Sequence, residues 1–387
     1  ALQIFIRCVA FDHDHQSPPF GKIFIMAQKG TKTQPPLQFS YFSGSAGVIV
    51  RHGPPKGKEE KELGVLKGAG VWEYSPNGAY IAGCLASCVK VYAANDFSLV
   101  AEIPAVKASK VYFSPRSTYV CVWNRSQKKA DGKRDPNFTV YDIKNKKVMA
   151  SWTVINVNNW PSLQWSNDES IAVRLINSAL LIFHGNDLHT SKVEIKMDKL
   201  KSFRIGKGKK DKRIAAFVPE FKSNPGVVKI FCVTIKDGQW ACREEASKTF
   251  FRASDVSYYW NSKSTSLLVR AQTDVDAQGR SYYGESRLYY LRPNQQTPDI
   301  KTKGVIHMVD WEPNGDFFAV AHGDMPHVNV TIYHRNGSVN KQIKLKTARN
   351  YVKFSPCGRL LIVGAFGSLS GDVNIYDWKA PRLVGFF

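Results

Sequence analysis

The sequence predicts an all-β fold assembled from repeats. The first observation is a recurring motif, in which an apolar residue, a spacer and an aromatic residue precede Ser, Asn or Glu, commonly with Pro and Gly. Its copies lie at residues 71–78, 111–115, 163–168, 259–262, 309–315 and 352–358. Fixed patterns that return about every 40–50 residues are typical of solenoid and propeller folds.

The second observation is that the motif copies are followed by further short β-rich runs. Residues 80–84, 89–92 and 99–103 follow the first copy, and 360–363 and 373–376 follow the last in the same order. Runs of this composition, bounded by Gly, Asn, Asp or Ser, are typical of strands. The third observation is that no long apolar stripe has a helical period. Because four short antiparallel strands form one blade, the sequence predicts a WD-repeat-like β-propeller.

The motif places a strand and a turn in each repeat. Pro presets φ and Gly accepts a positive φ, so the residues after the aromatic suit a tight turn. Central strands are expected at residues 71–74, 111–113, 163–165, 309–311 and 352–354. Side chains alternate between the faces of a strand, so the aromatic that ends each of them is expected to be buried between neighbouring blades.

Seven blades are clearly readable. Six follow from the motif copies, and a seventh is expected between Trp165 and Trp260, where residues 203–205, 213–218 and 228–233 have strand character without the Ser-Pro turn. Residues 39–50 add apolar, strand-like sequence ahead of the first clear blade.

Composition and cysteine use favour a cytoplasmic protein. No apolar run approaches the ~20 residues that span a bilayer, so no membrane partner is expected. Residues 1–7 lack the charged-then-apolar order of a secretory signal. The seven cysteines include no Cys-x-x-Cys pair, and most lie in apolar runs. Cysteines of this kind are expected to be reduced and buried.

Positive charge is the second informative feature. Lysine and arginine total 54 against 32 acidic residues, a net charge of +22. An excess of this size favours a polyanionic partner such as nucleic acid. The densest cluster spans residues 199–213, where two glycines predict a flexible loop. The candidate RNA-binding residues are Lys207, Lys209, Lys210, Lys212 and Arg213. Nothing there reads base sequence, so phosphate contacts are expected. The alternative is a set of solvated loop charges.

Signatures of enzymes are weak. The Gly206 segment lacks the spacing of a Walker phosphate loop, and no Gly-x-Ser-x-Gly elbow occurs. His13 with His15, and His322 with His327, have no third metal ligand at usable spacing. We therefore predict a non-enzyme with no catalytic residue, no metal site and no cofactor.

Two segments resemble the hallmark insertion in the propeller of eukaryotic translation initiation factor 2A. They are Thr273-Asp274-Val275-Asp276 and Ser281-Tyr282-Tyr283-Gly284-Glu285. Further stretches match in order at residues 159–169, 248–253 and 364–371, and residues 44–55 resemble the family's N-terminal stretch. On this resemblance, residues 39–387 form the propeller and residues 1–38 form an extension outside it. The family's nine blades and basic helical tail imply that the propeller is incomplete relative to the family, either because the chain is truncated at Phe387 or because the ring is open there.

The insertion supplies a second set of candidate residues. They are Asp274, Asp276, Tyr282, Tyr283 and Glu285. Two acids and a Tyr-Tyr-Gly turn suit a hairpin-like excursion better than a core strand. We expect the tyrosines to brace the adjoining blade, since Tyr is commonly packed with a hydrogen-bonded hydroxyl; the alternative is stacking on a partner.

The resemblance implies a cytoplasmic, non-enzymatic factor that binds the small ribosomal subunit and its RNA. It also implies GTP-independent delivery of initiator methionyl-tRNA, and contacts with mRNA and other initiation factors. One alternative is a scaffold like the b subunit of initiation factor 3, whose ribonucleoprotein motif has no match here. A scaffold that binds only proteins is the other.

Overall fold

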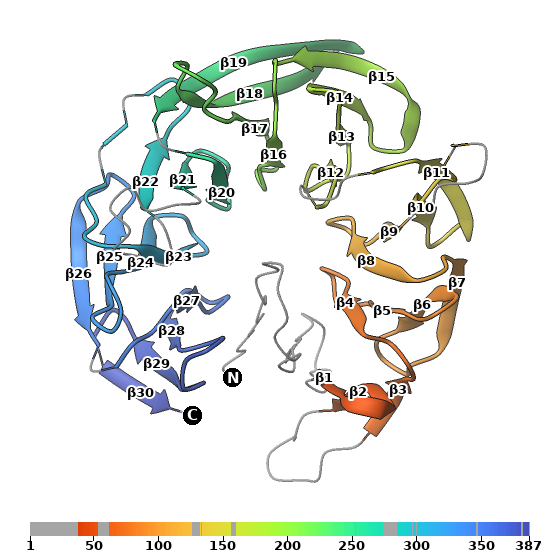
Figure 1. Ribbon diagram of the computed structural model, residues 1–387, viewed down its shortest axis with the longest axis horizontal. Coiled ribbons are helices and arrows are strands. Elements are labelled where there is room, and N and C mark those ends of the chain that lie inside the picture. The colour runs from red at the N-terminus through yellow and green to blue at the C-terminus, as the bar shows by residue number, and fades with distance from the viewer. Residues whose placement is uncertain are drawn as a thin grey trace. The chain divides into compact units, whose positions relative to one another are not determined.

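The computed structural model describes residues 38–52, 62–125, 132, 134–155, 160–251, 253–273, 285–295, 297–298, 300–345, 347–380 and 382–386. Within these residues the regular structure is thirty strands and one short 3₁₀ helix, η1 (Gly44–Ala46). The strands form eight sheets (Figure 1), and the pairs whose registers are defined are antiparallel. The all-β prediction is confirmed.

The described chain divides into two compact units. One comprises the described residues up to Ala172 together with Phe183–Thr190, and the other comprises Val173–Ile182 together with the described residues from Ser191 onward.

The first four sheets each follow chain order or its reverse. Their strands are β1 (Gln38–Ser43), β2 (Gly47–His52) and β3 (Glu62–Leu66); β4 (Val71–Tyr74), β5 (Tyr80–Cys84), β6 (Cys88–Ala93) and β7 (Leu99–Pro104); β8 (Ala108–Phe113), β9 (Tyr119–Asn124), β10 (Phe138–Asp142) and β11 (Lys147–Trp152); and β12 (Leu163–Trp165), β13 (Ile171–Ile176), β14 (Ala179–His184) and β15 (Asp187–Lys196).

The last four sheets have the same simple order. Their strands are β16 (Ser202–Ile205), β17 (Lys212–Val218), β18 (Gly226–Lys236) and β19 (Gln239–Phe250); β20 (Asp255–Trp260), β21 (Leu267–Gln272) and β22 (Ser286–Leu291); β23 (Ile306–Trp311), β24 (Phe317–His322), β25 (Asn329–His334) and β26 (Val339–Lys344); and β27 (Tyr351–Phe354), β28 (Leu360–Gly364), β29 (Val373–Asp377) and β30 (Arg382–Phe386).

The number of sheets differs from the number of blades expected. Each of the seven readable repeats forms one sheet, and residues 39–50 contribute strands β1 and β2 to an eighth, which β3 completes. The nine blades implied by the resemblance are not confirmed by the described residues. Nor do all sheets have four strands, because β1–β3 and β20–β22 have three each.

The aromatic residues that end the motif strands are buried, as predicted. Trp165 and Trp311 are 3% and 8% exposed. Trp260 donates its indole N–H to the carbonyl of Arg204 at 3.2 Å, and Trp311 donates to the carbonyl of Tyr259 at 2.8 Å. Both acceptors belong to the first strand of the preceding sheet, so these bonds join neighbouring first strands in addition to the apolar packing.

The motif turns have a common geometry that explains their composition. In the turn at residues 75–78, the Ser75 hydroxyl accepts the N–H of Tyr80 at 2.8 Å, and the Gly78 N–H bonds to the Ser75 carbonyl at 2.9 Å. φ is positive at the fourth turn residue in all six turns, from 54° at Ser264 to 78° at Gly315. Glycine therefore suits this position, since it adopts positive φ without steric penalty.

A second repeated feature lies in the third strand of five sheets. An aliphatic residue precedes an aromatic one there, and the pairing with the fourth strand shifts register between the two. The pairs are Val91/Tyr92, Val140/Tyr141, Ile230/Phe231, Ile332/Tyr333 and Ile375/Tyr376. Such bulges increase local twist and are a further mark of the repeat.

Candidate nucleic-acid interface

The basic segment is the connection between β16 and β17, where six other sheets carry the four-residue motif turn. We call residues 206–211 the basic loop. The N–H of Gly206 bonds to the carbonyl of Arg213 at 2.8 Å and closes the loop, as the N–H of Ser75 bonds to the carbonyl of Tyr80 at 2.9 Å in a motif turn. The basic loop therefore replaces the motif turn in this sheet.

The basic loop rests directly on the motif turn of the next sheet, residues 261–264. The N–H of Gly208 donates to the Ser264 hydroxyl at 2.6 Å. A Cβ atom at Gly208 would lie 2.6 Å from the carbonyl oxygen of Lys263, and one at Gly206 would collide with the Ser264 side chain. The two glycines thus allow a close approach between backbones. The flexible loop expected from the sequence is instead held in place by these contacts.

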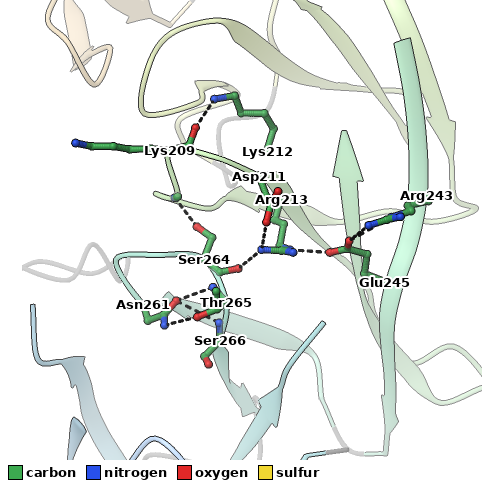
Figure 2. Close-up of polar contacts among 11 residues, drawn as sticks. Lys209, Asp211, Lys212, Arg213, Arg243, Glu245, Asn261, Ser264, Thr265 and Ser266 are labelled. Carbon is green, nitrogen blue, oxygen red and sulfur yellow. Dashed lines mark hydrogen bonds and ion pairs between the residues drawn. The ribbon is translucent and has the colours of Figure 1, made fainter. Parts of the chain in front are cut away.

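The lysines of the cluster differ in their surroundings. Lys207, Lys209 and Lys210 are exposed. Lys212 is half-buried, and its ammonium group donates to the carbonyl of Lys209 at 3.0 Å (Figure 2). Three of the predicted cations are therefore presented at the surface, whereas Lys212 also closes the loop internally.

Arg213, which the sequence analysis named as a candidate RNA-binding residue, is largely buried: its side chain is only 10% exposed. Its guanidinium is 2.6 Å from the Glu245 carboxylate and 3.0 Å from that of Asp211, and it also donates to the Ser264 carbonyl at 3.2 Å (Figure 2). Arg213 thus ties the end of the basic loop to β19 and to the neighbouring turn. This geometry favours a role in positioning the loop, while a contact between Arg213 and phosphates stays a prediction.

Glu245 is the buried centre of this ion cluster. Its carboxylate also accepts from Arg243 at 2.9 Å, and its side chain is 1% exposed. Burial raises the pKa of Glu245, but the hydrogen bonds and charges of Arg213 and Arg243 outweigh burial and hold this pKa below its usual value. The cluster therefore contains an ionised carboxylate at neutral pH, with both arginines as its counter-ions.

The turn at residues 261–264 is itself well braced. The Asn261 side-chain oxygen accepts the N–H groups of Thr265 and Ser266 at 2.9 and 3.2 Å, and its amide donates to the Thr265 hydroxyl at 2.9 Å (Figure 2). Sequence reasoning missed the roles of Ser264 and Glu245. The weak motif copy at residues 259–262 was the available signal for the first, but nothing local pointed to the second.

The family-motif residues Asp274, Asp276, Tyr282 and Tyr283 lie outside the described residues. Glu285 is described: its N–H donates to the Thr273 hydroxyl at 3.0 Å, and its carbonyl accepts the N–H of Thr273 at 3.0 Å. These bonds extend the antiparallel pairing of β21 with β22 by one residue pair. The insertion therefore connects two adjacent antiparallel strands, β21 and β22, while the bracing role of the tyrosines stays a prediction.

The remaining candidates do not form a site in the part of the chain that is described. No group of three or more His, Cys, Asp or Glu side chains there is arranged to hold a metal. His322 is buried, and its ring nitrogens lie 3.0 Å from the Lys303 carbonyl and 2.8 Å from the Thr331 hydroxyl. A helix long and apolar enough to cross a membrane is likewise not found among the described residues.

Comparisons with known proteins place this geometry in context. A sequence model of the family described as "Eukaryotic translation initiation factor eIF2A" matches residues 248–385. Eukaryotic translation initiation factor 2A of Dictyostelium discoideum is 32% identical over 81% of this chain and 51% of its own length. The Schizosaccharomyces pombe protein of the same name is 29% identical over 88% of this chain and 58% of its length.

These matches confirm the resemblance to the initiation factor 2A family. The chain spans little more than half the length of these two relatives. The b subunit of eukaryotic translation initiation factor 3 from Xenopus laevis is also similar, at 25% identity over 79% of this chain and 43% of its length. The relatives are therefore translation initiation factors.

Solved structures agree on the fold. One described as "Crystal structure of the eukaryotic initiation factor" is 27% identical, with a TM-score of 0.75 over 90% of this chain and 84% of that one. The C-terminal WD40 domain of Sif2 is 12% identical, with a TM-score of 0.52 over 87% of this chain and 92% of that one. The second likeness concerns the fold alone, and together they confirm the predicted β-propeller class.

Proposed function

We propose that this chain is the propeller part of a non-enzymatic translation initiation factor that binds the small ribosomal subunit through phosphates of ribosomal RNA. The observation that carries the proposal is the basic loop, whose exposed lysines Lys207, Lys209 and Lys210 stand on a backbone fixed by the Gly208–Ser264 bond. The net charge of +22 and the names of the relatives support the same interpretation.

The loop is suited to phosphates and not to bases. Ammonium groups on flexible stems act as point charges, which attract any phosphate and carry no sequence information. Asp211, the acidic residue within the loop, is engaged by Arg213 at 3.0 Å and is partly neutralised by it. Binding of this kind releases counter-ions from RNA and weakens steeply with salt.

The wider role proposed is that of the family. The factor acts in the cytoplasm and supports GTP-independent delivery of initiator methionyl-tRNA, in contact with mRNA and other initiation factors. Because the chain spans about half the length of its relatives, we assign ribosome docking to the propeller and leave tRNA delivery to the whole factor. No catalytic group or cofactor takes part in this proposal.

Co-sedimentation with purified small subunits tests docking directly. A variant with Lys207, Lys209 and Lys210 changed to Ser is compared with one in which the exposed Lys192, Lys222 and Lys344 are changed to Ser, so that both lose the same charge. We expect the loop variant to lose most binding and the control variant to retain it. Equal binding by the two variants would contradict the proposal.

Pull-down from extract with and without nuclease addresses the alternative of a protein-only scaffold. That alternative predicts that the partners stay bound after nuclease treatment, whereas binding through RNA predicts that they are lost.

A further inference from the structure

The turn next to the basic loop carries a cation that the sequence analysis did not single out. Lys263 is the third residue of the turn at 261–264 and is exposed. Its carbonyl faces Gly208 so closely that a Cβ there would lie 2.6 Å from it. Lys263 thus lies beside the basic loop in space although more than fifty residues separate them in the sequence.

Two independent contacts hold the loop and the turn together. One is the hydrogen bond from the Gly208 N–H to the Ser264 hydroxyl at 2.6 Å. The other is Arg213, whose guanidinium reaches Asp211 in the loop at 3.0 Å and the Ser264 carbonyl in the turn at 3.2 Å (Figure 2). The hydrogen bonds from Gly208 to the Ser264 hydroxyl and from Arg213 to the Ser264 carbonyl are buried, so the fold sets the spacing between the backbone of the loop and that of Lys263.

A similar turn-to-turn bond elsewhere shows what is particular to this pair. The N–H of Arg116 donates to the Glu169 carboxylate of the next motif turn at 2.7 Å. There the fourth turn residue places an acid beside the cation. At the basic loop the corresponding residue is the neutral Ser264, so the positive charges of the two connections add.

We infer that Lys263 joins Lys207, Lys209 and Lys210 in one phosphate-binding surface that spans two neighbouring sheets, with the RNA backbone as its ligand. This inference rests on the proposed function. A surface formed by two connections can contact phosphates on either side of a turn in the RNA backbone, which a single loop reaches less well. Ser264 and Arg213 act as positioning residues, since they fix the lysines without being placed to meet the phosphates themselves.

The test measures the salt dependence of binding to a single-stranded RNA oligonucleotide and to small subunits. Lys263→Ser is compared with Lys222→Ser, which removes an exposed lysine from the turn at the opposite end of the β16–β19 sheet. We expect Lys263→Ser to reduce the slope of log K against log salt by about 0.7, the value for one phosphate contact on a single strand, and Lys222→Ser to leave the slope unchanged. Equal slopes for the two variants would overturn the inference.

A second variant separates charge from position. Ser264→Ala keeps every lysine and removes the bond to Gly208, so we expect several-fold weaker binding with the wild-type salt slope. Wild-type affinity in Ser264→Ala would overturn the positioning role. If the variant lacking Lys207, Lys209 and Lys210 binds poorly while Lys263→Ser binds normally, the inference fails and the proposed function stands. If all these variants bind normally, the proposed function fails as well.

Discussion

The backbone N–H of Gly208 donates a 2.6 Å hydrogen bond to the hydroxyl of Ser264 in the next sheet. The same relationship recurs between motif turns, where Asn77 donates to the Ser117 hydroxyl at 3.3 Å and Arg116 to the Glu169 carboxylate at 2.7 Å. In these three cases the connection between the first two strands of one sheet is therefore hydrogen-bonded to the fourth turn residue of the next sheet. This feature makes the basic loop an ordered part of the fold, in spite of its glycines and lysines.

Gly208→Ala should disturb this relationship. The added Cβ would lie 2.6 Å from the Lys263 carbonyl oxygen, and backbone on both sides would have to move. We expect a loss of about 1–3 kcal/mol in the free energy of unfolding, as for other overpacked sites, together with weaker RNA binding. Chemical denaturation measures the first effect. Gly70→Ala is the control, because a Cβ at Gly70 meets nothing within 4 Å; a loss of stability as large in Gly70→Ala would contradict the explanation.

Glu245→Gln should be strongly destabilising at neutral pH. The substitution removes the buried carboxylate that pairs with Arg213 and leaves Arg213 with the partly exposed Asp211 at 3.0 Å. Removing one partner of a buried pair costs about 3–5 kcal/mol, and the remaining pair with Asp211 places the expected loss at the lower end of that range. Glu244→Gln is the matched control, since Glu244 is the neighbouring residue, is 40% exposed and pairs with Lys229 at 2.9 Å; its expected cost is about 0.5 kcal/mol.

The pH dependence of that difference follows from the lowered pKa of Glu245. A carboxyl whose pKa is lower in the folded state stabilises the fold above its unfolded value, about 4.3, and loses this contribution as pH falls through the folded value. The difference in unfolding free energy between wild type and Glu245→Gln should therefore be full at pH 7 and shrink below about pH 4. A difference that stays constant down to pH 2–3 would show that the ionised carboxylate is not its source.

Trp311→Phe should weaken the contact between neighbouring first strands. It removes the indole N–H that donates to the Tyr259 carbonyl at 2.8 Å, as well as buried ring volume. We expect a loss of about 2 kcal/mol, seen as a lower Tm. Phe251→Leu is the comparison, because Phe251 is 63% exposed and should tolerate the change. A Tm unaffected by Trp311→Phe would mean that this bond contributes nothing to the joining of the sheets.

Cys357 should be the most reactive of the described cysteines. It is exposed in a motif turn, and hydrogen bonds from the Ser355 hydroxyl and the Arg359 backbone lower the pKa of its thiol. Burial instead raises the pKa of Cys84 to about 12 and that of Cys121 well above its usual value. Brief alkylation with iodoacetamide at pH 8, followed by peptide mapping, should modify Cys357 first. Equally fast modification of Cys84 or Cys121 in the folded protein would contradict their burial.

The sequence was sufficient to predict the strands and turns because their causes are local. Trp165 and Trp311 mark the ends of first strands, and after Trp311 the residues Pro313 and Gly315 suit the φ values that the turn requires. The register shift in the third strands also has a local sequence signal, but no prediction was made from that signal. The shift falls between an aliphatic residue and the aromatic residue after it, as at Ile332/Tyr333.

Arg213 shows why the candidate site was only partly predicted. In the sequence it is one more cation in a basic run, next to lysines that are exposed. Its role depends on the pairing of β17 with β18 and of β18 with β19, which brings Glu245 within 2.6 Å across 32 positions of sequence. Only the register of three strands reveals that partner. The contact between the basic loop and Lys263 is non-local in the same way.

The salt dependence of RNA binding tests the central claim most directly. Affinities of the wild type, of Lys207/Lys209/Lys210→Ser and of the control Lys192/Lys222/Lys344→Ser are measured by filter binding to a single-stranded oligonucleotide and to small subunits, between about 50 and 200 mM salt. The account predicts that the slope of log K against log salt falls by about 2 in the loop variant, roughly 0.7 for each lost contact, and is kept in the control. A loop variant with the wild-type slope and affinity would contradict it and show that these lysines are only solvated charges.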